Sequence, residues 1–207
     1  MEKSVKISAL AITLNEAGTM RSFLESLWFA DEIIIVDSLS SDETRAIASE
    51  NEKVTFYERK FDNFSAQKNF ALSKAKHDWV VFFDLDEEVT KPLSEEIVKE
   101  LHDPTAVAYE VKRDFYFMGK RIKYSGLQND RVVRFFNKKY CSYNTNLVHE
   151  TLEVKGETAV LKCHLPHHTY KNSKDALQKK ETSHAISFLI SSVLQILASI
   201  CDPFGLS

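Results

Sequence analysis

The sequence predicts an α/β protein with a mostly parallel sheet, and two observations lead to this fold class. Apolar segments of strand length alternate with helical patterns through the N-terminal half. One segment, 32–37 (EIIIVD), is a nearly continuous apolar run, which is typical of a strand buried on both faces of a parallel sheet. Strands that alternate with helices form right-handed parallel units. With 207 residues, 43% of them hydrophobic, the chain can bury the core of one domain.

The N-terminal elements are expected in strict alternation. An apolar stripe at the helical period predicts the first helix and consists of Met20, Phe23, Leu24, Leu27 and Trp28. The strands are expected at 5–13, 32–37, 54–58 and 79–84, and the later helices at 41–50, at 63–75 and from Pro92 onward. Proline in a first turn followed by glutamates is typical of a helix start.

The C-terminal half has a different pattern. Alternating and aromatic segments after about residue 105 predict paired strands, with MGKR (118–121) as a turn between them. A charged helix from about residue 173 leads into 185–201, seventeen residues without a charge. Because this length is short for a bilayer span, we expect a helix that docks on the core or lies in a membrane interface. The expected parts are a βαβ half (1–104), a mixed-sheet half of the same domain (105–172) and a C-terminal helix (173–207).

Cysteine usage and charge restrict the compartment and the partners. The three cysteines are odd in number and widely spaced, which favours a reducing compartment over a disulfide framework. No export signal is visible at the N-terminus, so we expect a cytoplasmic protein. The net charge of −3 conceals an acidic segment, 84–103, followed by a basic segment, 111–140.

Carboxylates follow two of the predicted strands. Asp37 closes the strand at 32–37, and Asp84 and Asp86 come at the end of the strand at 79–84. The carboxyl ends of parallel strands border one crevice, so these side chains are expected to meet there. Continued strand geometry would put Asp84 and Asp86 on one face, roughly 6–7 Å apart, where they can share Mg²⁺ or Mn²⁺ with substrate phosphates. The alternative is a solvated acidic turn.

Phosphate binding through glycine is not indicated. The five glycines form neither a dinucleotide-binding nor a P-loop motif, so a metal ion would have to carry the phosphate charge.

Several motifs in order resemble a known family. They are TLNEA, VDSLSSDET, QKNFAL and FFDLDEEV, followed by SGLQNDRVVRFF, LVHETLEV and HLPHHTY. The chain thereby resembles family 2 glycosyltransferases, and within them the bacterial lipopolysaccharide core glycosyltransferases. The resemblance implies the GT-A fold, a Rossmann-like, mostly parallel sheet flanked by helices. It also implies an inverting, metal-dependent transfer of a sugar from a nucleotide-diphosphate donor, with a UDP-sugar expected, to a glycolipid or oligosaccharide acceptor.

The resemblance assigns roles to individual residues. Asn15 and Glu16 match the nucleotide-facing turn, with helix capping as the alternative, and Asp37 matches the carboxylate that accepts from the base or ribose. Lys68 resembles a basic residue near the nucleotide, and the alternative is a solvated lysine on a helix face. Ser38, Ser40, Asp42 and Thr44 are expected to shape a turn and cap the next helix, and Asn69 to position Lys68.

The metal site and the catalytic base are assigned in the same way. Asp84 and Asp86 match the metal-binding D-x-D motif, with Asp86 as the direct ligand, and His167 is expected to complete the site. Glu150 is the first candidate for the base that takes the acceptor proton, and Asp130 is the second; His149 is expected to orient the base or line the acceptor site. Glu87 is expected to face the sugar hydroxyls. A zinc site from Cys163, His164, His167 and His168 lacks a second ligand pair at suitable spacing.

The basic segment is expected to hold a phosphorylated, lipid-linked acceptor at the inner face of the cytoplasmic membrane, with 185–201 as a peripheral contact. Its candidate residues are Lys120, Arg121, Lys123, Arg131 and Arg134, with Tyr116 and Tyr124 stacking on sugars; an ordinary solvated sheet face is the alternative. Two other functions remain open: a nucleic-acid binder that uses 111–140, which the acidic net charge disfavours, and a phosphatase of the haloacid dehalogenase type, whose D-x-D motif follows the first strand rather than the fourth.

Overall fold

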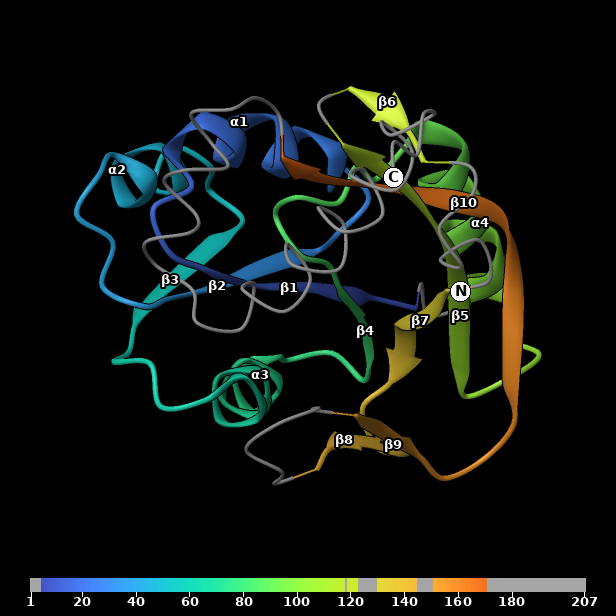
Figure 1. Ribbon diagram of the computed structural model, residues 1–207. Coiled ribbons are helices and arrows are strands. Elements are labelled where there is room, and N and C mark those ends of the chain that lie inside the picture. Colours follow the sequence, from blue (N-terminus) through green and yellow to red (C-terminus); the bar gives the residue numbers. More distant parts are fainter. Residues whose placement is uncertain (1–4, 118, 123–129, 145–150, 171–207) are drawn as a thin grey trace, which may run out of the picture. The chain divides into compact units, whose positions relative to one another are not determined.

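The computed structural model describes residues 5–117, 119–122, 130–144 and 151–170. It has two compact units, one of Met1–Asp114 with Asn129–His167 and a smaller one of Phe115–Gln128 with His168–Ser207. The α/β class predicted from the sequence is confirmed (Figure 1). The expected helix at 173–207 lies outside the described residues. Within those residues, no helix is both long and apolar enough to cross a bilayer.

Helices and strands alternate up to α4, and strands follow. The helices are α1 (Ala17–Ser26), α2 (Thr44–Ala48), α3 (Phe64–Lys74) and α4 (Lys91–His102). The strands are β1 (Ile7–Thr13), β2 (Glu32–Asp37), β3 (Val54–Glu58), β4 (Trp79–Phe82), β5 (Ala108–Phe117), β6 (Lys120–Arg121), β7 (Arg131–Asn137), β8 (Cys141–Tyr143), β9 (Leu152–Val154) and β10 (Thr158–Tyr170).

Most of the strands form one mixed sheet. Over the described residues the order is β10-β5-β7-β4-β1-β2-β3, with β6 added to β5. β4, β1, β2 and β3 are parallel neighbours, whereas β7 runs antiparallel between β4 and β5. The carboxyl ends of β1, β2 and β4 therefore lie at one edge of the sheet, which is where ligands bind in open α/β folds.

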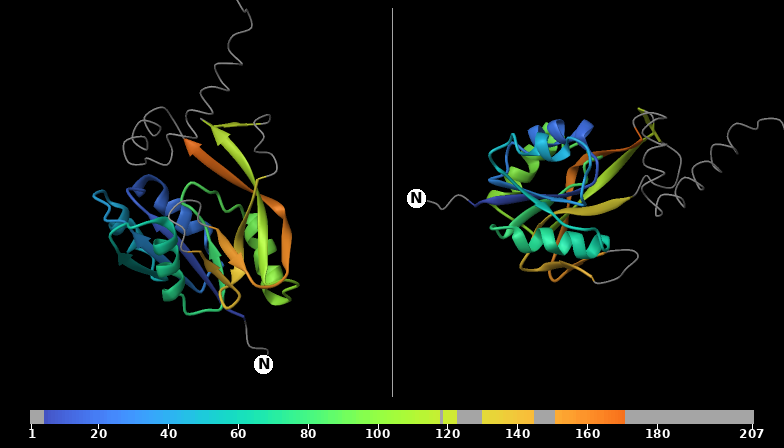
Figure 2. Two further views of the ribbon diagram at one scale, coloured as in Figure 1. Left: turned by 60° about the horizontal axis from the view of Figure 1, so that its bottom comes forward. Right: turned by 90° about the vertical axis from the view of Figure 1, so that its left-hand side faces the viewer.

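Both faces of the parallel strands are covered. One core contains residues of α1 and α4, including Phe23 and Ile97, packed on one side of β1, β2 and β4. The other contains residues of α3 and of the β8–β9 hairpin, including Leu72 and Tyr143, packed on the opposite side. Figures 1 and 2 show α1, α2 and α4 on one face of the sheet and α3 with β8–β9 on the other. This double cover explains why EIIIVD is apolar throughout, since every residue of β2 is buried.

One detail differs from the sequence prediction, and another agrees with it. Trp28 was assigned to the buried stripe of the first helix, but α1 ends at Ser26 and Trp28 is 55% exposed. Its indole N–H donates to the Ser94 hydroxyl at 3.2 Å. The expected pairing around MGKR is confirmed, because β5 and β6 are antiparallel and Phe117 pairs with Lys120. Gly119 in this turn has φ +75°, a backbone conformation that favours glycine.

Tyr109 on β5 provides a test of the packing. Its ring stacks on Phe135 at 4.9 Å, and its hydroxyl oxygen accepts the backbone N–H groups of Thr105 at 2.8 Å and Ala106 at 3.2 Å. Tyr109→Phe removes this acceptor, so we expect the free energy of unfolding to fall by about 1–2 kcal/mol in urea denaturation. The control Tyr140→Phe, at an exposed tyrosine, should change it by less than about 0.5 kcal/mol. Equal values for the two variants would contradict the assigned hydrogen bonds.

Candidate active site

The acidic segment after β4 forms a turn instead of continuing the strand. β4 ends at Phe82, and the N–H of Glu87 donates to the carbonyl oxygen of Asp84 at 3.0 Å. The Glu87 carboxylate reaches back and accepts the N–H of Asp84 at 3.0 Å. The expectation that Asp84 and Asp86 share one face of an extended strand was therefore wrong, because the backbone is folded and held by a side chain.

Asp86 lies beside His167. The N–H of Glu88 donates to the carbonyl oxygen of Pro166 at 2.8 Å, and Glu87 forms an antiparallel bridge with His167, so β10 runs along the turn. This contact sets the His167 Nε2 atom 3.2 Å from the Asp86 Oδ2 atom. The two side chains are 15% and 26% exposed, respectively. Two of the residues predicted to bind a metal are thus brought together at a site open to solvent.

Asp84 is bonded to a buried arginine. Arg134 on β7 is 4% exposed, and its Nη2 group donates to the Asp84 carboxylate and to Glu87 Oε1, the latter at 2.7 Å. Burial opposes the ionisation of Asp84, but the positive charges of Arg134 and, to a smaller extent, Lys68 outweigh it and lower its pKa to about 2. Asp84 is therefore an anion at neutral pH.

The carboxylate of Glu87 is buried with Arg134. It is 4% exposed, and its Oε1 atom also accepts from Arg134 Nε at 3.2 Å. Burial raises the pKa of Glu87, an effect that Arg134 opposes and the neighbouring Asp84 charge reinforces. The expectation that Glu87 faces sugar hydroxyls was wrong, because its oxygens are used inside the protein.

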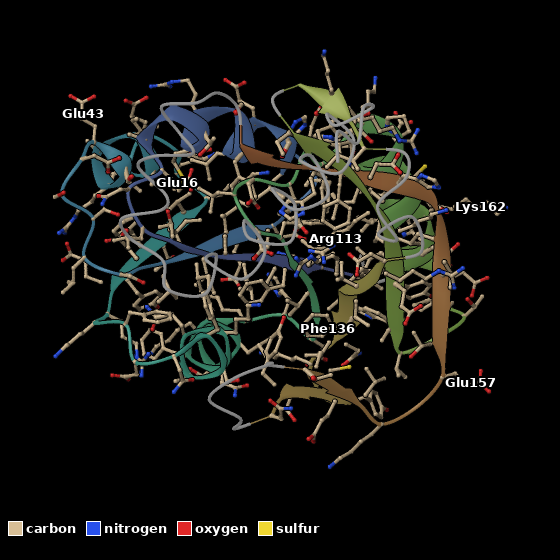
Figure 3. The ribbon with its side chains drawn as sticks, in the orientation of Figure 1. Glu16, Glu43, Arg113, Phe136, Glu157 and Lys162 are labelled. Atoms are coloured by element: carbon tan, nitrogen blue, oxygen red, sulfur yellow. The ribbon has the colours of Figure 1, made fainter. Side chains whose placement is uncertain are left out.

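A second arginine extends this chain of charges. Arg113 on β5 lies 3.7 Å from Glu87 and donates through Nε to Asp130 at 2.5 Å. Figure 3 shows Arg113 inside the fold, in contrast to the exposed Lys162 on β10. Charges of opposite sign therefore alternate from Asp84 through Arg134, Glu87 and Arg113 to Asp130.

This arrangement corrects the interpretation of the basic segment. Arg134 was predicted to hold the acceptor from the surface, but it is buried among carboxylates. Arg113 and Lys139 are paired with Asp130 and Asp78, respectively. The segment 111–140 is thus less basic at the surface than its sequence indicates, which weakens the nucleic-acid alternative.

The loops after β1 and β2 are tied together. The Asp37 carboxylate, buried at the end of β2, accepts the N–H of Ser40 at 2.7 Å and also its hydroxyl. The Ser40 hydroxyl oxygen accepts the N–H of Asn15 at 2.7 Å, and Asn15 Oδ1 accepts the N–H of Ser41 at 2.8 Å. Asn15 has φ +54°, in the left-handed region. Asp37 and Asn15 therefore fix the shape of this edge of the sheet.

Polar side chains of the loop after β2 also accept hydrogen bonds from backbone N–H groups at the start of α1. The N–H of Glu16 donates to Thr44 Oγ1 at 2.8 Å, and the N–H of Ala17 donates to Asp42 at 3.1 Å. The prediction that Ser40, Asp42 and Thr44 shape a turn is confirmed. Of the capping expected at the next helix, α2, the structure shows Asp42 accepting the N–H of Thr44 at 3.0 Å, whereas the N-cap residue itself, Glu43, makes no capping bond through its side chain. Glu16 precedes α1 without capping an amide through its side chain, which accepts the Thr19 hydroxyl at 2.7 Å.

Lys68 on α3 is buried beside aromatic rings. Its Nζ atom lies 5.3 Å from the centre of the Tyr143 ring and 5.9 Å from that of Phe82. The alternative of a solvated lysine on a helix face was wrong. Asn69 donates to the carbonyl oxygen of Tyr143 at 2.9 Å and accepts its N–H at 3.2 Å, which fixes α3 against β8.

Gln67 and Arg113 are site residues that the sequence did not identify, and Arg134 is one to which the sequence assigned a different role. Gln67 is fully buried and donates to Ser38 Oγ at 3.1 Å, so it joins α3 to the loop after β2. The available signal was for Arg134, which lies between apolar residues of one strand, where a buried polar group requires partners. Glu150 and His149 lie outside the described residues.

The residues present fit a divalent cation. Asp86 supplies a carboxylate oxygen and His167 an imidazole nitrogen at one half-buried position, and both are ligands for ions such as Mn²⁺. Asp84 is held by Arg134. Among the described residues, no group of three or more His, Cys, Asp or Glu side chains could hold a metal ion, so waters and substrate phosphates would have to supply the remaining ligands. Cys163, His164 and His168 lie elsewhere: His164 contacts Asp114, and His168 packs on Tyr116.

Comparison with solved structures identifies the fold. The chain superposes on S. aureus TarS 1–349 with a TM-score of 0.60 and 16% identity, covering 79% of this chain and 60% of that one. A TarS 1–349 structure in complex with UDP-GlcNAc gives a TM-score of 0.58 at 14% identity, covering 83% and 61% of the two chains. At these identities the likeness concerns the fold.

Sequence comparison identifies the family. An uncharacterized glycosyltransferase of Rickettsia felis is 34% identical over 151 residues, covering 70% of this chain and 52% of that protein. The lipopolysaccharide core biosynthesis glycosyltransferase LpsC of Rhizobium meliloti is 28% identical over 162 residues, covering 75% and 60%. The chain thus spans about half the length of the Rickettsia relative. The model of glycosyl transferase family 2 matches residues 8–159, and the chain therefore belongs to this family and has its GT-A fold.

Proposed function

We propose that the protein is an inverting, metal-dependent glycosyltransferase that moves a sugar from a nucleoside-diphosphate donor to a hydroxyl group of a saccharide acceptor. One observation carries the proposal: the turn after β4 brings Asp86 to within 3.2 Å of His167 at the edge of the sheet where parallel α/β folds bind ligands. Family membership supports this reaction and argues against the phosphatase alternative.

The donor is assigned to the edge formed by the ends of β1, β2 and β4. Asp37 and Asn15 hold the two loops that border it, and Glu16 begins α1 next to them. Lys68 contributes a positive charge near Asp84, and we assign it to the donor diphosphate. A UDP-sugar is the donor that we favour, and the UDP-GlcNAc complex of TarS supports a donor of this class.

Asp86 and His167 are the residues assigned to hold Mg²⁺ or Mn²⁺. When bound, such an ion stabilises negative charge on a leaving diphosphate. Asp84 contributes as a fixed anion, while Arg134 neutralises part of the charge that the acidic turn would otherwise concentrate. This division of roles explains how several carboxylates can be adjacent without all being exposed.

The transfer itself is a single displacement at the anomeric carbon. A bond forms between the acceptor oxygen and that carbon while the bond to the diphosphate oxygen breaks, and the hydroxyl proton passes to a carboxylate. Glu150 remains our first candidate for this base and Asp130 the second. Because Asp130 is an ion-pair partner of Arg113, a role as base would require it to change that contact.

A lipid-linked saccharide is the acceptor that we favour. The similarity to LpsC supports lipopolysaccharide core or other cell-surface glycan synthesis. Lys120 and Arg121 are exposed, and we assign them to acidic groups of such an acceptor. Cytoplasmic location with peripheral contact to the inner membrane face through 185–201 belongs to the same proposal.

Calorimetric binding of nucleotides tests the proposal. UDP, ADP and GDP are titrated into the protein with and without Mn²⁺. We expect one of them to bind at least tenfold more tightly with Mn²⁺, and Asp86→Asn to abolish this difference. Asp78→Asn, at the opposite end of β4, is the matched control and should bind as the wild type does. If none of the three nucleotides binds to the wild type with Mn²⁺, the acidic turn is not a donor site and the proposal is wrong.

A further inference from the structure

The acidic turn contains more negative charge than a cation site needs. Asp84, Asp86, Glu87 and Glu88 occupy four of the five positions 84–88, and like charges at this spacing favour an open, solvated loop. The turn is nevertheless closed by two hydrogen bonds between Asp84 and Glu87. Some other group must therefore offset the repulsion, and it has to act on the two residues that close the turn.

Arg134 meets this requirement. It enters from β7, the antiparallel neighbour of β4, and bonds to both Asp84 and Glu87. Its planar group presents several N–H donors in fixed directions, so one side chain can bind two carboxylates and set their separation. Arg113 binds Glu87 from β5 and supports the same oxygen.

The consequences extend to Asp86 and His167. Glu87, which Arg134 holds, also forms the backbone bridge with His167. The position of the imidazole relative to the turn, and with it the 3.2 Å contact to Asp86, therefore depends on the residues that Arg134 fixes. Arg134 is bonded to the carboxylates of Asp84 and Glu87, whereas the carboxylate of Asp86 contacts His167.

Stability alone does not account for this network. Buried ion pairs recover their desolvation cost poorly, and apolar side chains of similar volume are often as stable in their place. Hydrogen bonds around a ligand site can instead hold a ligating side chain in one orientation. Here Arg134, Asp84 and Glu87 would hold the carboxylate of Asp86 in this way.

We infer that Arg134 is a positioning residue for divalent-cation binding: it fixes the Asp84–Glu87 turn so that Asp86 and His167 face one cation, without contacting the cation itself. The inference rests on the proposed function for the cation site. It makes cation affinity depend on the hydrogen-bonding geometry of a buried arginine, and not merely on a positive charge at this position.

Arg134→Lys tests this inference, because it keeps the charge and removes the planar arrangement of donors. Free Mn²⁺ is measured by electron paramagnetic resonance during titration in the presence of UDP, ADP or GDP, at a temperature where circular dichroism shows each variant folded. We expect Arg134→Lys to weaken Mn²⁺ binding by about 10- to 100-fold. The control Arg131→Lys, on the same strand and 51% exposed, should change it by less than about twofold.

The outcomes separate the inference from the proposal on which it rests. Wild-type binding that persists in folded Arg134→Lys overturns the inference and leaves the proposed function intact. Absence of Mn²⁺-dependent binding in the wild type overturns both. If Arg134→Lys does not fold, Glu87→Gln is used, because it retains Arg134 and its bond to Asp84 and weakens the two hydrogen bonds that Arg134 donates to residue 87. A folded Glu87→Gln variant should bind Mn²⁺ several-fold more weakly, and unchanged binding again overturns the inference.

Discussion

Arg134→Met is expected to lower the free energy of unfolding by about 3–5 kcal/mol, the usual range for removing one partner of a buried ion pair. Methionine fills much of the same volume but leaves Asp84 and Glu87 without the guanidinium group that both contact. Glu87 is buried, so solvent cannot replace the lost hydrogen bonds without opening the turn. Urea denaturation of both proteins at pH 7 measures the difference.

Two further variants make this stability prediction specific. Arg131→Met removes an exposed arginine of the same strand, 4.0 Å from Glu110, and should change the free energy of unfolding by less than about 0.5 kcal/mol. In Arg134→Met the buried carboxylate of Glu87 has lost its Arg134 partner. Adding Glu87→Gln removes this unpaired negative charge, so the double variant should be more stable than Arg134→Met alone. A loss below about 1 kcal/mol for Arg134→Met would show that the turn does not depend on this arginine.

Asp86→Asn is expected to reduce donor turnover by about 100-fold or more while the protein stays folded. The exchange removes a charged cation ligand, and stabilisation of a leaving group by a metal amounts to several kcal/mol. Among the described residues, Asp86 makes its ion-pair contact with His167, so Asp86→Asn leaves no buried arginine without its carboxylate. Release of nucleoside diphosphate from a panel of nucleotide sugars with Mn²⁺, followed with and without oligosaccharide acceptors, measures the rate.

Substitution of two other aspartates, Asp84 and Asp78, shows whether the turnover lost in Asp86→Asn is specific to Asp86. Asp84→Asn should lose stability as well as turnover, because Arg134 then faces one carboxylate fewer. Asp78→Asn, at the start of β4 and paired with Lys139 at 2.6 Å, should retain wild-type turnover. Equal turnover in Asp86→Asn and Asp78→Asn would remove Asp86 from the cation site.

The parallel half of the fold could be predicted because its signals are local. Continuous apolar runs such as EIIIVD identify strands with two covered faces, and their alternation with helices specifies direct parallel connections. The order of the remaining strands depends on contacts between residues far apart in the sequence, which a local pattern does not indicate. β7 inserts between β4 and β5, and nothing in RVVRFF states which neighbours it pairs with. The end of α1 was misplaced for a similar reason, because Trp28 continues the helical period beyond the last helical residue.

The site was predicted in part. Asp86 and His167 were identified through motifs about 80 positions apart, and their proximity needed the long return of β10 to the turn. Arg134 was assigned to the surface together with the rest of the basic segment, because its charges suit a phosphorylated acceptor. The sequence does contain two observations that favour a buried position: Arg134 lies between the apolar residues Val133 and Phe135 of one strand, and the acidic turn requires a positively charged partner. Only the pairing of β7 with β4 connects them.

Anomalous diffraction at the manganese edge, from crystals grown with Mn²⁺ and the nucleotide that binds best, tests the central claim most directly. The account predicts one strong peak within coordination distance of both Asp86 and His167, with diphosphate oxygens completing the shell and Arg134 still bonded to Asp84 and Glu87. A nucleotide bound at this edge of the sheet without manganese at Asp86, or manganese bound only elsewhere, would contradict it.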